Sequence, residues 1–128
     1  MSNLIDLLLG AGDKVLDRPT GEYELKRLSA LCGEPFIISL RALTMREFNE
    51  LPLGDDFRVH VVLKSVTAPD FRDSRLLAKY TPEGRKTPLT PIELLNKMLL
   101  PGEITTLAAK IEDLSGFGKN AIEEIKKN

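Results

Sequence analysis

The spacing of apolar residues changes along the chain from a period of two to a period near 3.6, and the change falls close to residue 44. Tyr23 and Leu25 alternate with charged neighbours, as they would in a half-buried strand. A second alternating run extends from Phe36 to Leu43, and Leu31–Pro35 between the two contains the glycine and proline of a turn. The pattern therefore predicts an antiparallel hairpin over about residues 22–43, which must pack on helices to be stable.

From residue 44 onward the pattern becomes helical, and several first turns have recognisable caps. Thr44–Glu47 and Thr90–Glu93 each match a capping box, in which a hydroxyl and a carboxylate bond backbone N–H groups that the helix leaves unpaired. Asp73 is placed to cap a shorter helix, and Pro91 and Pro101 stand at helix starts, where a missing N–H costs nothing. Residues 44–128 are therefore predicted to form a series of short helices.

The apolar run over residues 57–66 fits two structures. Its first half alternates as a strand would, whereas a second set of residues has the spacing of one helix face. That set is Val59, Val62, Leu63 and Val66. A helix is favoured, because Leu63–Val66 continues the helical spacing and breaks the alternation.

The last third of the chain is predicted to contain a polar loop followed by helices. Thr81–Pro88 has two prolines and a glycine, which is typical of a loop. Gly116 is placed to end the helix that begins at Pro101, and a final short helix is predicted around Ala121, Ile122 and Ile125. The apolar stripe of the Pro101 helix consists of Ile104, Leu107, Ala108, Ile111 and Leu114.

The first segment predicts a helix over residues 3–12, capped by Ser2 or Asn3 and stopped by Gly10 or Gly12. A helix that is apolar nearly all round must be buried somewhere. Packing on its own domain is the simpler alternative, and docking on a partner protein or on a second copy is the other. The apolar residues that cover more than one face are Leu4, Ile5, Leu7, Leu8 and Leu9.

Length and composition place these elements in one domain, residues 1–128, of the α+β class: short α-helices packed with an antiparallel β-hairpin. The net charge of −1 gives no electrostatic reason to expect nucleic-acid binding. The apolar run at the N-terminus is short and contains Asp6, so neither a membrane span nor a signal peptide is expected. The single Cys32 excludes an intrachain disulfide and favours a reducing compartment, the cytoplasm.

The sequence contains few residues that are suited to catalysis. His60 is the only histidine and lies in an apolar run, and a nucleophilic Cys32 would need a base that the spacing does not supply. A zinc site would need further soft ligands. Adjacent acidic pairs such as Asp55–Asp56 point in different directions on a helix and are better explained as solvated faces. We therefore expect no cofactor, no metal and no enzymatic activity.

Several segments together resemble the XkdN-like phage tail assembly chaperones of prophage-type contractile tail clusters. The most specific is Leu94–Ile104, with the sequence Leu-Leu-Asn-Lys-Met-Leu-Leu-Pro-Gly-Glu-Ile. The loop Thr81–Pro88 is longer and more polar than expected between such helices, which leaves the alignment there open. The other similar segments are Ile111–Phe117, Asn3–Leu9, Glu24–Ser29, Gly33–Phe36 and Val62–Val66, with Pro69, Phe71 and Asp73 following.

The resemblance implies a chaperone that engages the tape measure protein, the long helical chain that sets tail length, in the cytoplasm of the bacterial host. Such a chain exposes apolar stripes before the tail tube closes around it, so a coat of small proteins would keep it soluble. The tail tube protein and a second copy of the chain are further candidate partners. The alternative function is a structural tail or head-completion protein that stays in the particle and assembles by strand addition at the hairpin edge.

The resemblance provides no binding residues, so the candidates follow from exposed apolar character alone. Leu99 and Leu100, at a helix junction, join the first helix in this set, although Leu99 also suits the core. We expect an exposed apolar patch of roughly a few hundred Å² to mark the site. The candidate partner-binding residues are Leu4, Ile5, Leu8, Leu9, Leu99 and Leu100.

Overall fold

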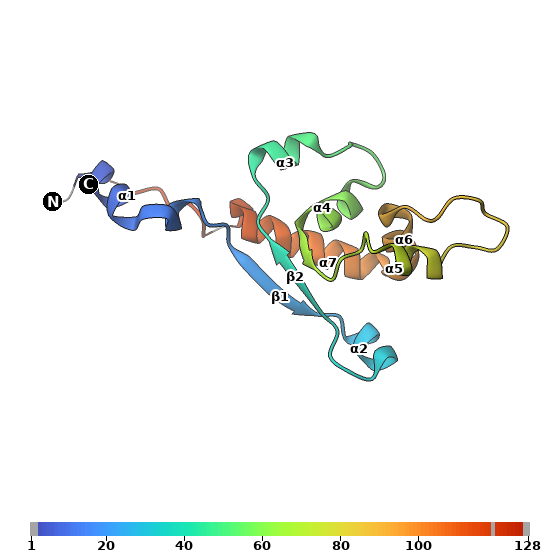
Figure 1. The fold of residues 1–128 in the computed structure, drawn as a ribbon. Coiled ribbons are helices and arrows are strands. Elements are labelled where there is room, and N and C mark those ends of the chain that lie inside the picture. Colours follow the sequence, from blue (N-terminus) through green and yellow to red (C-terminus); the bar gives the residue numbers. More distant parts are fainter. Residues whose placement is uncertain (1–2, 119, 127–128) are drawn as a thin grey trace.

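The computed structural model describes residues 3–118 and 120–126, and shows an α+β fold in which helices pack around a small antiparallel sheet (Figure 1). The elements along the chain are α1 (Leu4–Ala11), the 3₁₀ helix η1 (Gly12–Leu16), β1 (Thr20–Glu24), α2 (Lys26–Cys32), β2 (Ile37–Arg41), α3 (Met45–Glu50), α4 (Phe57–Ser65), β3 (Val66–Ala68), α5 (Ser74–Lys79), α6 (Pro91–Met98), α7 (Pro101–Glu112) and the π-helical turn η2 (Asp113–Phe117).

The predicted hairpin is confirmed, although its connection differs from the prediction. Strands β1 and β2 pair antiparallel, with Thr20 opposite Arg41 and Glu24 opposite Ile37. Residues 26–32, expected to finish a strand and begin a turn, form helix α2 instead. Leu25 and Leu28 are both buried three residues apart, so the segment has the spacing of a helix face.

A third strand, which the sequence analysis missed, follows α4 directly. Strand β3 pairs antiparallel with β2, giving the order β1–β2–β3 with an irregularity between Ser39 and Leu40. The side chain of Ser65 fixes this junction, because its Oγ donates to the carbonyl of Arg41 at 2.6 Å and accepts from the N–H of Arg41 at 3.2 Å. The predicted helix over residues 57–66 is thus confirmed to Ser65, and Val66 begins a strand.

The core lies between the sheet and helices α4, α6 and α7. Helix α4 contacts both α7 and α6. Every residue of the predicted apolar stripe on α7 is buried except Leu114, which packs partly buried at its edge. Among the side chains that are essentially inaccessible are Ile38, Leu40, Val61, Val62, Phe71, Leu94, Leu95 and Ile111.

The predicted helix starts are confirmed. Both capping boxes form: the N–H groups of Glu47 and Glu93 donate to the hydroxyls of Thr44 and Thr90, and each carboxylate accepts from the threonine N–H in return. Asp73 caps α5 by accepting from the N–H of Arg75 at 2.8 Å. Local side-chain chemistry therefore fixes the first turns of α3, α5 and α6.

The predicted helix around Ala121–Ile125 is wrong, since residues 121–126 contain no helix. Gly116, with φ of 90°, ends the preceding helical turn as expected. Beyond it, Ile122 and Ile125 are 88% and 79% exposed. A short helix needs a buried apolar face to hold it, and this segment has none among the described residues.

The polar loop over residues 81–88 is confirmed and is tied to the start of α6. The guanidinium of Arg85 donates to both carboxylate oxygens of Glu93, at 2.7 Å and 2.8 Å, and to the carbonyl of Pro88. Thr81 accepts from the N–H of Leu89 at 2.9 Å, so the two ends of the loop are joined.

Acid is expected to weaken the fold between about pH 4.5 and pH 2 through Glu93. The hydrogen bonds from Arg85, together with the N–H of Thr90, lower the pKa of Glu93 from 4.5 to about 2. In this window the unfolded chain binds a proton that the folded chain does not. The stabilisation is therefore complete above the pKa that Glu93 has in the unfolded chain, 4.5, and is lost as the pH falls toward 2.

The measurement is thermal unfolding of Glu93→Gln at neutral pH and at about pH 3, within this window. The variant should be less stable than the wild type at neutral pH. Its unfolding temperature should fall less than that of the wild type when the pH is lowered. Glu83→Gln, at an exposed position in the same loop, should follow the wild type. An unchanged acid response in Glu93→Gln would assign the transition to other carboxylates.

Candidate partner-binding surface

Helix α1 and the following η1 carry apolar side chains that the rest of the molecule does not cover. No residue of either element is buried, and α1 projects from one end of the fold (Figure 1). The expectation that this helix packs on its own domain is therefore wrong. The exposed apolar residues of this segment are Leu4, Ile5, Leu7, Leu8, Leu9, Val15 and Leu16, each more than half exposed.

The sequence accounts for the helix and for its apolar surface. Asn3 caps α1 by accepting from the N–H of Ile5 at 2.7 Å, and Gly12, with φ of 63°, ends it. Asn3, Asp6 and Gly10 fall on one face at intervals of three and four residues. The apolar surface therefore covers most of the helix, and only this narrow stripe lacks large apolar side chains.

The linker after η1 is anchored to the body of the protein. The guanidinium of Arg18 donates to Glu47 at 2.6 Å and to the carbonyl of Ala42 at 3.4 Å, and the N–H of Ala42 donates to the carbonyl of Pro19 at 2.8 Å. Arg41 pairs with the second oxygen of Glu47 at 3.3 Å. These contacts fix where the chain leaves the fold, and hence the end of the molecule from which α1 projects.

The pKa of Glu47 reflects the groups that surround its carboxylate. Burial by itself raises the pKa of this carboxyl. The backbone hydrogen bond from Thr44 and the charges of Arg18 and Arg41 outweigh that effect, so the pKa lies below its ordinary value. Glu47 therefore serves both as the cap of α3 and as the anion that holds Arg18.

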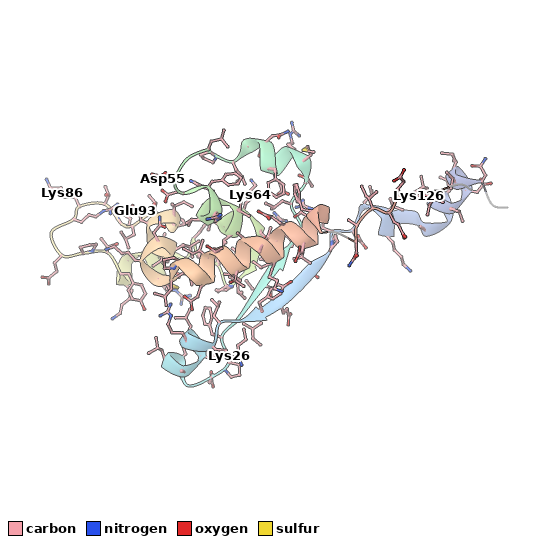
Figure 2. The ribbon with its side chains drawn as sticks, turned by 180° about the vertical axis from the view of Figure 1, so that it is seen from behind. Lys26, Asp55, Lys64, Lys86, Glu93 and Lys126 are labelled. Carbon is pink, nitrogen blue, oxygen red and sulfur yellow. The ribbon has the colours of Figure 1, made fainter. Side chains whose placement is uncertain are left out.

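The C-terminal segment contributes further apolar surface at this end. Ile122 and Ile125 are exposed, and residues 120–126 extend toward the end of the molecule that carries α1 (Figure 1). Figure 2 places Lys126 at that end, whereas Lys86 and Glu93 lie at the opposite end. Sequence analysis identified these isoleucines only as the face of a helix, and did not single out Val15 and Leu16.

The structure separates the predicted site residues into three groups. The four candidates on α1, Leu4, Ile5, Leu8 and Leu9, lie together and exposed. Leu100 is also exposed, but it lies at the junction of α6 and α7, away from α1 (Figure 1). Leu99 is 3% exposed and belongs to the core.

A second feature is a groove of about 390 Å³ between α2, the end of α5 and α6. The guanidinium of Arg27 is held at its rim by both carboxylate oxygens of Glu103, at 2.8 Å and 3.2 Å, and by the carbonyl of Met98 at 2.7 Å. The hydrogen bond from Arg27 lowers the pKa of Glu103 in turn. The groove is lined by Arg27, Leu28, Tyr80, Leu94, Lys97 and Met98.

Neither feature brings together the groups of a metal site. Within residues 3–118 and 120–126, no three histidine, cysteine or acidic side chains gather closely enough to hold a metal ion. Cys32 is exposed at the end of α2, and His60 lies on α4. No helix in the same residues has the length and apolar character needed to cross a membrane.

Comparison with known proteins identifies a family for more than half of the chain. A family described as phage XkdN-like tail assembly chaperone protein matches residues 54–126, which is more than half of the chain. The matched span runs from just before α4 to the C-terminal segment and includes the loop over residues 81–88. Helix α1, the hairpin and α2 lie outside it, and so do the three similar segments quoted from that part. No curated protein and no solved structure matches the chain.

Proposed function

The chain belongs to the family of phage XkdN-like tail assembly chaperones, and from this premise we propose that it binds the tape measure protein through α1 and η1. In this proposal the protein acts without catalysis, in the cytoplasm of the bacterial host, and keeps its partner soluble until the tail tube forms. The observation that carries the proposal is the uncovered apolar surface of α1.

Physical considerations favour a helical, apolar partner. Fully burying a leucine or isoleucine side chain contributes about 1.5–3 kcal/mol, and the four candidates on α1 can each gain part of that amount. A helix that is apolar over most of its circumference can pack on one helix and still cover part of another. Such a surface suits a long helical chain with apolar stripes and needs no precise polar match.

The fixed linker also supports this function. Because Arg18 is bonded to Glu47 and to Ala42, the helix is presented away from the core, and its apolar residues add nothing to the packing of α4, α6 and α7. The fold can therefore stay intact whether α1 is free or bound. This is the behaviour required of a chaperone that must later release its partner.

The test is co-expression with the tape measure protein encoded beside this chain. The two proteins should co-purify, and the tape measure protein should remain soluble only when the chain is present. Purified particles should lack the chain. If the tape measure protein precipitated regardless, and the chain were instead found in finished particles, the structural-protein alternative would replace this proposal, with the free edge of β1 as its assembly surface.

A further inference from the structure

We propose that the groove between α2 and α6 binds helix α1 of a second copy of this chain, so that copies associate head to tail. The floor of the groove is apolar and is formed by Leu28, Leu94 and Met98. Its rim is formed by Arg27, Lys97 and Tyr80. The guanidinium of Arg27 is already paired with Glu103, so the exposed Lys97 is the cation that this rim offers to a ligand. The groove therefore suits an apolar segment with a carboxylate that can reach Lys97.

The N-terminal segment of another copy has this chemistry. Residues 3–17 contain three aspartates and one lysine, so their net charge is −2. Asp6 lies on the narrow polar stripe of α1, flanked by leucine and isoleucine side chains that are more than half exposed. An apolar helix seated on the floor would bring this carboxylate near Lys97, where complementary charge fixes orientation and partner choice.

The occupant must come from another molecule, because α1 and the groove lie at opposite ends of the sheet. Strand β1 begins at Thr20, next to the anchored Arg18, and ends at Glu24, next to α2 (Figure 1). Each copy therefore offers a helix at one end and a groove at the other. Two different surfaces that meet in this way form an open chain or a ring rather than a symmetric dimer.

This association can be measured without the tape measure protein, although both proposals use α1. A free chaperone would expose an apolar helix that favours aggregation, and the groove of the next copy would cover it. A tape measure segment that binds α1 would then compete with the groove. Self-association would thus keep α1 covered until the tape measure protein binds it.

Two variants that damage different surfaces test the proposal. Leu4→Asp/Leu8→Asp replaces apolar side chains of α1 by carboxylates. Tyr80→Asp/Lys97→Glu replaces two exposed side chains at the rim of the groove by carboxylates. Sedimentation of the wild type should show a mass that rises with concentration, and each variant alone should remain a monomer. An equal mixture should form a species of two copies, because one intact helix and one intact groove remain in it.

The controls separate the remaining outcomes. Lys110→Glu makes the charge change of Lys97→Glu at an exposed position on α7 and should associate like the wild type. Thermal unfolding of every variant shows whether the fold is kept. A monomeric wild type, a mixture that stays monomeric, or a groove variant that still dimerises through α1 would each overturn the proposal. Tyr80→Asp/Lys97→Glu should still bind the tape measure protein, so failure of this inference is distinguishable from failure of the proposed function.

Discussion

Leu99→Ala is expected to lower the free energy of unfolding by about 2–5 kcal/mol, whereas Leu100→Ala should change it by no more than about 0.5 kcal/mol. The two leucines are neighbours between α6 and α7, but Leu99 is 3% exposed and Leu100 is 52% exposed. Truncation at Leu99 removes buried methyl groups and leaves a cavity among the core residues. At Leu100 the same truncation removes atoms that water already contacts.

Urea unfolding of both variants and of the wild type measures the difference. Leu99→Met nearly conserves the volume of the side chain and should lower the free energy of unfolding by less than about 1.5 kcal/mol. This control separates the effect of lost volume from the effect of any substitution at this position. Equal effects of the two alanine variants would contradict the placement of Leu99 in the core. That result would return Leu99 to the candidate partner-binding residues.

The parts of the fold that sequence predicts well are those fixed by neighbouring residues. Thr44 with Glu47, and Thr90 with Glu93, carry their partners three residues away, so the capping boxes are visible in the sequence. The apolar stripe of α7 repeats at helical intervals and needs no knowledge of what covers it. These local signals are sufficient to place α3, α6 and α7.

The misassigned segments depend on contacts between distant residues. Strand β3 is three residues long and exists because it pairs with β2, more than twenty residues earlier in the chain. Helix α2 occupies a connection where a glycine and a proline suggested a simple turn, yet Leu28 has a core to pack against. The isoleucines near the C-terminus repeat as a helix face would, but no core covers them in the described residues.

For the candidate site, sequence reveals the surface but not its position. An N-terminal helix with five large apolar residues has more apolar surface than a small domain needs. The sequence does not reveal that Arg18 and Glu47 hold the linker so that α1 projects from the fold. The groove is harder still to foresee, because Arg27, Tyr80 and Lys97 come from three separate helical segments.

The family match and the exposed helix support different parts of the proposed function. The match covers α4 to α7, the helices that form most of the core, and gives the chain its place among tail assembly chaperones. Helix α1 lies before the matched residues, so its assignment as the binding surface depends on exposure and anchoring. Substitutions confined to α1 therefore test the binding surface without disturbing the part of the chain that defines the family.

Leu4→Asp/Leu8→Asp is expected to weaken binding to the tape measure protein at least about a hundredfold, which corresponds to about 2.8 kcal/mol. Both side chains are exposed in the free protein and lie one turn apart on α1. Hot-spot residues at the centre of an interface contribute about 2 kcal/mol or more when truncated, and a carboxylate in the place of Leu4 or Leu8 would also have to be desolvated. The fold should keep its stability within about 1 kcal/mol, because neither residue belongs to the core.

Binding is measured by titration of the purified chain onto an immobilised tape measure segment, with urea unfolding as the check on the fold. Leu4→Ala/Leu8→Ala, which keeps helix propensity, should weaken binding by at least about tenfold, so loss of the helix cannot account for the whole effect. Met45→Asp/Leu53→Asp places the same charges at exposed apolar positions outside α1 and should bind normally. Should the α1 variants unfold, or bind as tightly as the wild type, the partner must contact another surface, and Leu100 at the junction of α6 and α7 becomes the next position to substitute.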